Sequence, residues 1–184
     1  SIAYVDQGGI LQVGPLSAGA KPGPACYGLG GTQPTVTDAN VVLKRLPANQ
    51  LLAGSLAIDE SKAITAILSI GRQLGLSATQ TAEGIIAIAN EHMAQALRLI
   101  SIQRGFDPRE FTLTCFGGAG GLHLCDLAEM LEISTAVIPL HSGVLSALGM
   151  LCAKPGRELV KTKLSLLQEL NNQQIQQWLD ELYQ

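Results

Sequence analysis

The chain has 184 residues and a formal net charge of −3, and only 15% of its residues are charged, compared with about 25% in an average soluble domain. Its lysines and arginines are scattered rather than clustered, which argues against a nucleic-acid partner. No apolar run approaches the ~20 residues that a bilayer-spanning helix needs, so we expect a cytoplasmic protein without a membrane partner.

The low charge, together with 47% hydrophobic residues, predicts that further protein covers part of this surface. Serine rather than methionine stands first, and the chain starts directly in the apolar stretch 2–5. We therefore expect a piece of a longer protein. The four cysteines lie far apart and form no Cys-x-x-Cys pair, which predicts reduced thiols and no zinc site.

The first third of the chain predicts a hairpin followed by a long loop. Two short apolar segments, 2–5 and 10–13, flank the glycine turn 6–9, a pattern typical of a β-hairpin. Glycine and proline dominate residues 14–34, which excludes a regular helix or a central strand. Because 25–27 are packing residues, we expect an ordered loop over the domain, and long ordered loops are often functional.

A helix is expected over residues 35–46, with Thr37 or Asp38 as its N-cap and Pro47 as its end. Asp38 has two interpretations. Composition favours a capping carboxylate, and the alternative is a functional polar group held beside the glycine-proline loop.

Two amphipathic helices are predicted next. The first begins at Asp59 and ends before Gly75, and the second is capped by Ser77 and ends before Gly105. The apolar surface of the second helix is wider than one stripe, so we expect neighbours on more than one side. Its polar residues 90–92 are expected to lie at the surface or to make hydrogen bonds between helices, without a role in chemistry.

The stretch 111–123 is an apolar run that ends in four glycines and a histidine. Residues 111–116 predict a buried strand and 122–131 a helix, so the glycines mark a strand-to-helix turn. Such a turn can present free backbone N–H groups to an anion or a nucleotide, but its spacing matches neither the dinucleotide fingerprint nor the P-loop. A tight packing turn is the alternative. His123 is either a neutral hydrogen-bonding group, with its pKa lowered by the helix N-terminus, or a structural histidine.

The remaining segments predict an α/β fold. Strand, turn and helix recur over 111–151, with a buried strand at 135–138 and Ser142 as the N-cap of the helix that follows. This order implies parallel strands with covering helices. An outer strand at 158–164 and a glutamine-rich amphipathic helix at 166–183, interrupted near residues 171–172, complete the chain.

Five motifs then carry a family likeness. They are Ser1-Ile-Ala-Tyr-Val-Asp6, Ser17-Ala-Gly-Ala-Lys-Pro-Gly-Pro-Ala-Cys-Tyr-Gly28, Pro34-Thr-Val-Thr-Asp-Ala39, Phe116-Gly-Gly-Ala-Gly120 with Leu122-His123, and Gly143-Val-Leu-Ser-Ala-Leu-Gly149. Together and in this order they resemble the hydantoinase A/oxoprolinase family. That family includes the A subunit of ATP-dependent N-methylhydantoinases, oxoprolinase and a subunit of acetone carboxylases.

The resemblance implies that residues 1–154 belong to the C-terminal half of an actin-like ATPase (ribonuclease H-like) domain, and that 155–184 begin a following segment. The phosphate-binding hairpins of the family lie upstream, so the piece alone would be inactive. In that fold the turn after the strand faces the adenosine of ATP. The backbone contacts would come from Gly117, Gly118, Ala119 and Gly120.

The implied activity is ATP-dependent hydrolysis of a cyclic amide, in which ATP and Mg²⁺ activate the substrate by phosphoryl transfer. Asp38 and His123 match family motif positions and become candidate catalytic residues, with Cys26 and Tyr27 near the same cleft. No metal ligand is assigned. The implied partners are a small cyclic amide and a B-type subunit or domain, and a homo-oligomer is left open.

Two other functions stay open. The low charge and apolar helices also suit a non-catalytic subunit-assembly module of an acetone carboxylase-like complex. A different actin-fold kinase, acting for instance on sugars, is disfavoured by the loop 22–28. The sequence departs from the family pattern at two places. Gly121 stands where the family usually has proline, and 141–142 precede Gly143 where a proline is common. The first departure leaves the start of the following helix undetermined, and the second leaves the substrate-side loop undetermined. The motifs do not choose among hydantoin, oxoproline and ketone substrates.

Overall fold

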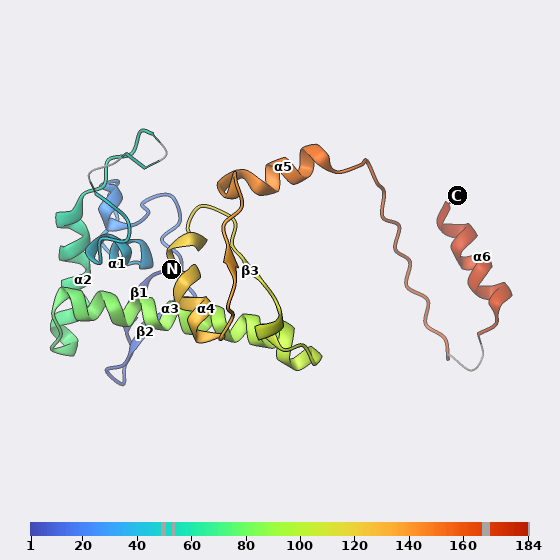
Figure 1. Ribbon diagram of the computed structural model, residues 1–184, viewed down its shortest axis with the longest axis horizontal. Coiled ribbons are helices and arrows are strands. Elements are labelled where there is room, and N and C mark those ends of the chain that lie inside the picture. The colour runs from blue at the N-terminus through green and yellow to red at the C-terminus, as the bar shows by residue number, and fades with distance from the viewer. Residues whose placement is uncertain (49–50, 53, 167–169, 184) are drawn as a thin grey trace. The chain divides into compact units, whose positions relative to one another are not determined.

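The computed structural model describes residues 1–48, 51–52, 54–166 and 170–183. Its chain divides into two compact units, Ser1–Leu145 and Ser146–Gln184. The first unit holds most of the helices and all four named strands (Figure 1). Among the described residues, no helix combines the length and the apolar character of a membrane span.

The first unit begins with the predicted hairpin. Strands β1 (Ala3–Val5) and β2 (Leu11–Val13) pair antiparallel. The carboxylate of Asp6 closes the turn, because its Oδ1 accepts hydrogen bonds from the N–H groups of Gly8 (2.9 Å) and Ile10 (3.0 Å). The hairpin prediction is confirmed.

The glycine-proline loop is ordered and packed against the core, as its composition predicts. It contains a short 3-10 helix, η1 (Ala25–Tyr27), in which Ala25 and Cys26 are buried. The carbonyl of Cys26 accepts a hydrogen bond from the N–H of Asp59 at 2.8 Å. The loop is therefore held by the start of the next long helix.

Three helices form the main body of this unit. They are α1 (Val36–Val42), α2 (Glu60–Leu74) and α3 (Ala78–Ser101). Helix α3 is long and contacts α1, α2, β2 and the later helix α4 (Leu124–Met130) (Figure 1). Neighbours on more than one side of this helix were expected from its wide apolar surface, and that prediction is confirmed.

The helix boundaries follow the capping residues. Asp59 and Ser77 cap α2 and α3, and Gly75 ends α2 in the left-handed conformation, all as predicted. The predicted cap of α1 is wrong. Thr35 is the N-cap and Asp38 is the third helical residue of a capping box, and the helix ends at Val42, before Pro47.

The core lies where α1, α2 and α3 meet the hairpin. Ile67 and Ile85 are fully buried at its centre, and burying one such side chain stabilises the fold by about 1.5–3 kcal/mol. The other buried members of this cluster are Ala3, Val13, Ala39, Ile70, Ala82 and Ile86.

A smaller sheet follows α3 after the 3-10 helices η2 (Ile102–Arg104) and η3 (Pro108–Glu110). Strands β3 (Leu113–Thr114) and β4 (Ala136–Val137) pair parallel, which confirms the predicted parallel arrangement and a mixed α/β organisation.

The predicted burial of these two strands is wrong. The apolar residues around them are exposed by 41% to 59%: Phe111, Phe116, Val137 and Ile138. Parallel strands are buried when other strands and helices cover both faces. Among the described residues, these two strands form a sheet by themselves.

Helices at the end of the chain differ in part from the sequence prediction. His141, not Ser142, precedes the 3-10 helix η5 (Ser142–Val144), and α5 (Leu145–Cys152) continues from it. Helix α6 begins at Asn172 and runs to Tyr183. The helix therefore covers the part after the predicted interruption near 171–172. Residues 166, 170 and 171, which were predicted as helix, are not helical, and 167–169 lie outside the described residues.

The predicted outer strand at 158–164 is absent from the described part of the chain, where this segment is extended but unpaired. Instead it faces α6 through side chains. Lys161 Nζ donates a hydrogen bond to Glu181 Oε2 at 2.6 Å, and Lys163 Nζ lies 5.6 Å from the centre of the Trp178 ring. An exposed salt bridge of this kind contributes little stability.

All four cysteines are free, as predicted. Cys26 and Cys115 are buried, whereas Cys125 and Cys152 are exposed.

Candidate functional site

The glycine turn follows β3 and lies on the surface. Gly117 has a φ of +91°, which favours glycine, and its N–H donates to the carbonyl of Ser142 at 2.8 Å. Gly118 and Ala119 are exposed, and within the described residues no hydrogen bond is recorded for their N–H groups. This part of the turn therefore presents backbone donors to the outside.

Two glycines of the turn differ in what surrounds them. A Cβ atom on Gly120 would lie 2.7 Å from Cys115 Sγ, so this position needs glycine for close packing. A Cβ atom on Gly118 would meet no atom within 4 Å, and its φ is not positive. The packing interpretation of the turn explains Gly120 and leaves Gly118 without a structural reason.

His123 lies between η4 (Gly120–Leu122) and α4 and is 6% exposed. Its Nδ1 is 2.7 Å from Oδ1 of Asn90, a buried residue of α3. Burial is the main cause that lowers the pKa of His123, with a smaller effect of the Arg45 charge, and Asp126 opposes both. The expected direction of the pKa shift is confirmed, but burial is its main cause, whereas the helix N-terminus was the expected one.

Asn90 and Asp126 extend this contact into a polar network. Asn90 Nδ2 donates to Asp126 Oδ2 at 2.8 Å, and Arg45 Nη1 donates to the same oxygen at 2.6 Å. Arg45 also reaches the carbonyl of Leu122 at 3.3 Å. The network, defined as Arg45, Asp126, Asn90 and His123, joins the chain after α1 to α3 and α4.

Asp38 lies in a second, separate network and is fully buried. Its oxygens accept hydrogen bonds from the N–H groups of Ala25 (3.3 Å), Cys26 (2.8 Å) and Thr35 (3.0 Å), and from the Thr35 hydroxyl (2.7 Å). Asp38 is therefore a capping carboxylate, but as the third helical residue of the capping box and not as the N-cap, and the same carboxylate also holds η1 against α1. A catalytic role for Asp38 stays a prediction.

The predicted loop residues accompany Asp38 rather than His123. Burial, followed by the negative charge of Asp38, raises the pKa of Cys26, so its thiol stays protonated. Burial also raises the pKa of Tyr27. In the described residues no hydrogen bond connects this group with the network around His123.

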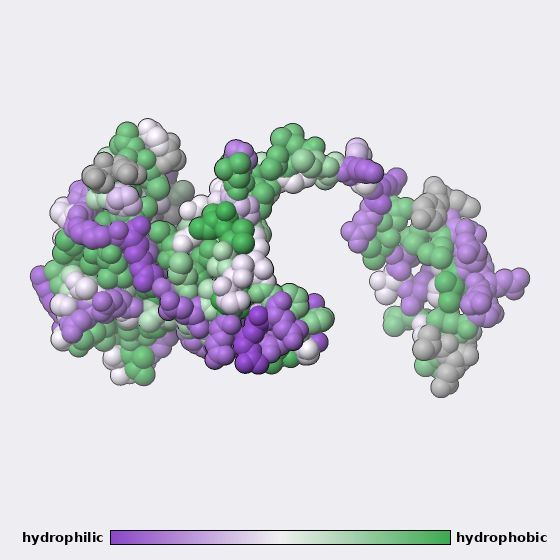
Figure 2. Space-filling model, viewed as in Figure 1, coloured by the Kyte–Doolittle hydropathy of each residue, from purple (hydrophilic) through white to green (hydrophobic). Residues whose placement is uncertain are grey.

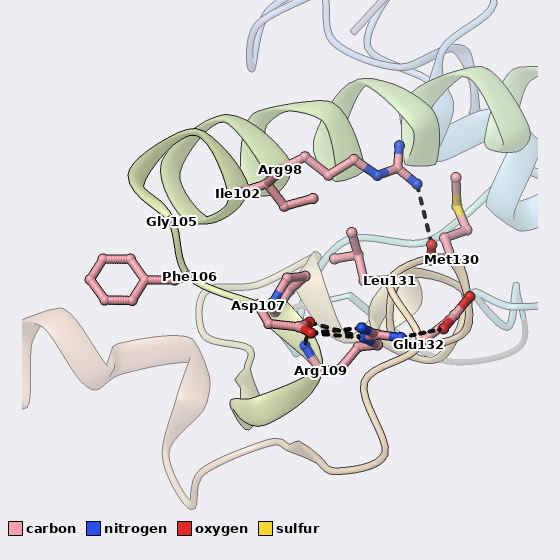
Figure 3. Close-up of a pocket in the computed structure, with 10 residues that line it drawn as sticks. Arg98, Ile102, Gly105, Phe106, Asp107, Arg109, Met130, Leu131 and Glu132 are labelled. Carbon is pink, nitrogen blue, oxygen red and sulfur yellow. Dashed lines mark hydrogen bonds and ion pairs between the residues drawn. The ribbon is translucent and has the colours of Figure 1, made fainter.

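A cleft of about 610 Å³ lies between the C-terminal end of α3, the loop after it and the end of α4. Figure 3 shows Arg109 between Asp107 and Glu132, at 2.7 Å and 3.6 Å, and Arg98 donating to the Met130 carbonyl at 3.2 Å. Arg98 also pairs with Glu91 at 3.1 Å, so both arginines have carboxylate partners and the cleft offers an anion little unneutralised charge. Its lining includes no residue of the glycine turn.

Asn90, Asp126 and Arg45 were not among the predicted site residues. Asn90 was expected at most to bond between helices, which it does. The available signal was an asparagine within the apolar surface of α3, between buried Ile86 and Ala94, since buried amides need partners. No spacing rule links residues 45, 90 and 126, because only the packing of α3 against α1 and α4 brings them together.

Comparison with known proteins identifies the family. Residues 1–158 match the family model described as Hydantoinase/oxoprolinase. The chain belongs to this family. Caprolactamase subunit alpha of Pseudomonas jessenii is 48% identical over 152 residues, which cover 82% of this chain and 22% of that protein. The 5-oxoprolinase of Saccharomyces cerevisiae is 35% identical over 156 residues, covering 79% of this chain and 12% of that protein.

Solved structures of hydantoinase/oxoprolinase relatives share the fold. The crystal structure of ATP-dependent caprolactamase from Pseudomonas jessenii covers 80% of this chain with a TM-score of 0.75. The nucleotide-free structure of acetone carboxylase covers 80% with a TM-score of 0.74 at 28% identity. This chain spans only 22% and 21% of those two chains.

Proposed function

We propose that this chain forms the adenosine-facing wall of the nucleotide site in an ATP-dependent enzyme that hydrolyses a cyclic amide. The observation that carries the proposal is the exposed turn at Gly118 and Ala119, whose N–H groups have no recorded hydrogen bond among the described residues, in a member of the hydantoinase/oxoprolinase family. Two relatives support it by name, an ATP-dependent caprolactamase and a 5-oxoprolinase. We further propose that the rest of the protein completes an actin-like ATPase domain in the cytoplasm.

The residues of this chain would bind and orient the nucleotide. Backbone N–H groups can approach a nucleotide closely at Gly118, because no Cβ atom intervenes. His123 adds a neutral, buried side chain three residues after the exposed turn ends at Gly120. ATP would supply the phosphoryl group that activates the amide oxygen toward ring opening.

Mg²⁺ would accompany ATP in this reaction. Among the described residues there is no group of three or more His, Cys, Asp or Glu side chains placed to hold a metal ion. Magnesium prefers phosphate oxygens, water and one or two carboxylates. We therefore propose that its protein ligands come from outside this chain.

Substitution of Gly118 tests the proposal. Gly118→Ala adds a methyl group in open space, so the free energy of unfolding should change by less than about 0.5 kcal/mol. The methyl group would stand between the backbone and the nucleotide, and we expect at least a tenfold weaker affinity for ATP in the whole protein that carries this chain. Isothermal titration calorimetry measures the affinity.

Gly156→Ala is the matched control, because a Cβ atom there is 4.0 Å from its nearest neighbour and far along the chain from the turn. Unchanged ATP affinity in Gly118→Ala would remove the adenosine-facing role. Activity is measured as ATP-dependent opening of hydantoin, 5-oxoproline and caprolactam.

An assembly module is the second candidate, supported by the exposed apolar residues Phe106, Phe111 and Ile138. A B-type subunit or domain is the partner proposed for either function. Size-exclusion chromatography with and without ATP separates the two. A pure assembly module forms complexes and does not respond to ATP.

A further inference from the structure

The orientation of the His123 ring is fixed by contacts from α3, from α4 and from the chain after α1. Asn90, 3% exposed on α3, uses both ends of its amide, with Oδ1 at His123 Nδ1 (2.7 Å) and Nδ2 at Asp126 Oδ2 (2.8 Å). An ionised carboxylate only accepts hydrogen bonds. The donor end of the Asn90 amide must therefore face Asp126, which leaves the acceptor end for His123.

This arrangement decides where the proton of the neutral imidazole lies. A carbonyl oxygen opposite Nδ1 requires a hydrogen on Nδ1, and Nε2 of the neutral ring is then a lone-pair acceptor. Arg45 completes the sequence of constraints, since its guanidinium holds the Asp126 oxygen at 2.6 Å. The order of the contacts runs from Arg45 through Asp126 and Asn90 to His123.

Nε2 of His123 is left without a recorded partner and is not sealed in the core. Within the described part of the chain, Asn40 Oδ1 is the one fully enclosed side-chain polar atom that lacks a hydrogen bond. No hydrogen bond is recorded for His123 Nε2 among the same residues. Among the described residues, Nε2 is therefore not completely enclosed, although the whole residue is only 6% exposed.

We propose that Asn90 and Asp126 are positioning residues that hold His123 in the Nδ1–H tautomer, so that Nε2 accepts a hydrogen bond from the bound ligand. The ligand group must then be a donor, such as a hydroxyl, an amino group or an amide N–H. An unprotonated phosphate oxygen would face the lone pair and be repelled. The tautomer depends on this fold alone, whereas its use toward a nucleotide or a cyclic amide depends on the function proposed above.

Long-range ¹H–¹⁵N correlation spectra of the chain without nucleotide test the tautomer, because the two ring nitrogens differ in shift when only one is protonated. We expect the Nδ1–H form to dominate for His123 at pH 7.5. Asn90→Leu keeps the approximate volume but removes the acceptor, so the Nε2–H form should rise to a comparable population. A dominant Nε2–H form in the unsubstituted chain would overturn the proposal.

Thr81→Ala is the matched control for Asn90→Leu. Thr81 lies on the same helix, is fully buried and donates to the Ser77 carbonyl at 2.8 Å, and no hydrogen bond to His123 is recorded for it among the described residues. We expect its spectrum to keep the His123 tautomer of the unsubstituted chain. An unchanged tautomer ratio in Asn90→Leu, or an equal change in Thr81→Ala, would show that Asn90 does not position the ring.

Kinetics of the whole protein that carries this chain test the use of the tautomer. Asn90→Leu should lower kcat for the ATP-dependent reaction at least tenfold with a smaller change in KM, and Thr81→Ala should leave kcat within about twofold. Full kcat in Asn90→Leu would overturn the positioning role in the reaction. If the unsubstituted protein shows no ATP-dependent activity, the proposed function fails, and the spectra still decide the tautomer.

Discussion

At the scale of single residues, the structure gives the two candidate catalytic side chains different positions. Both carboxylate oxygens of Asp38 accept hydrogen bonds, from Ala25, Cys26 and Thr35, whereas Nε2 of His123 has no recorded hydrogen bond among the described residues. Both residues are buried, and burial of a polar group is tolerated only when hydrogen bonds replace those to water. His123 is therefore the stronger candidate for contact with a ligand.

The lowered pKa of His123 predicts a pH dependence of stability. In the unfolded chain His123 binds a proton near pH 6.5, whereas in the folded chain it binds the proton only at lower pH. Between the folded pKa and pH 6.5, the unfolded state therefore holds more protons than the folded state. Stability is then full above about pH 6.5 and falls as the pH drops through the folded pKa.

Urea denaturation at pH 5 and pH 7.5 measures this effect. His123→Gln should lose less stability on acidification than the unsubstituted chain, and His92→Gln, which replaces an exposed histidine of α3, should behave like the unsubstituted chain. An equal loss in all three proteins would contradict the buried neutral state of His123.

At the scale of elements, the glycine-proline loop and α1 act as one folded piece. The Asp38 carboxylate caps α1 through Thr35 and at the same time accepts two N–H groups of η1. A residue that only caps a helix contributes about 1 kcal/mol. Asp38 should contribute more, because its removal leaves several buried donors unpaired.

Asp38→Ala is expected to lower the free energy of unfolding by about 3 kcal/mol or more. Ser77→Ala, which removes the cap of α3 and leaves no buried loop donor unpaired, is expected to cost only about 1 kcal/mol. Chemical denaturation monitored by circular dichroism compares the two. Equal costs would mean that Asp38 serves as a cap alone.

The sequence predicts helices and turns correctly where capping residues and glycines mark their ends. Caps and glycine stops predicted α2 and α3 nearly to the residue, and the glycine turn predicted the hairpin. It failed for the burial of β3 and β4, because burial depends on which other elements cover a sheet. It also placed a strand at 158–164, where the described residues pair with no neighbouring strand.

At the scale of the whole molecule, apolar surface is left uncovered. The chain spans 22% of the length of the caprolactamase subunit and 12% of the length of the 5-oxoprolinase cited for comparison. Figure 2 shows apolar surface beside β3 and over α5, where Met150 and Leu151 are exposed by 80% and 85%. Open strand edges and apolar patches of this kind promote association.

We therefore expect the 184-residue chain to self-associate in isolation. Ile138→Lys, which places a charge beside the exposed edge of β4, should shift sedimentation velocity profiles toward the monomer. Leu16→Lys is the control, since Leu16 is also exposed, by 69%, but lies in the loop before η1. An equal effect of both substitutions would indicate general solubility rather than association through the small sheet.

The amino-acid sequence by itself determined the helices with strong caps, the parallel order of the later strands and the family, because these depend on short-range chemistry and ordered motifs. Only the tertiary structure decided that the Asp38 carboxylate accepts hydrogen bonds from the loop, and that Asn90 and Asp126 hold His123. Those contacts join residues 12 to 36 positions apart. The physical reason is that a buried polar side chain takes its partners from whichever elements packing brings beside it, and no local pattern records that choice.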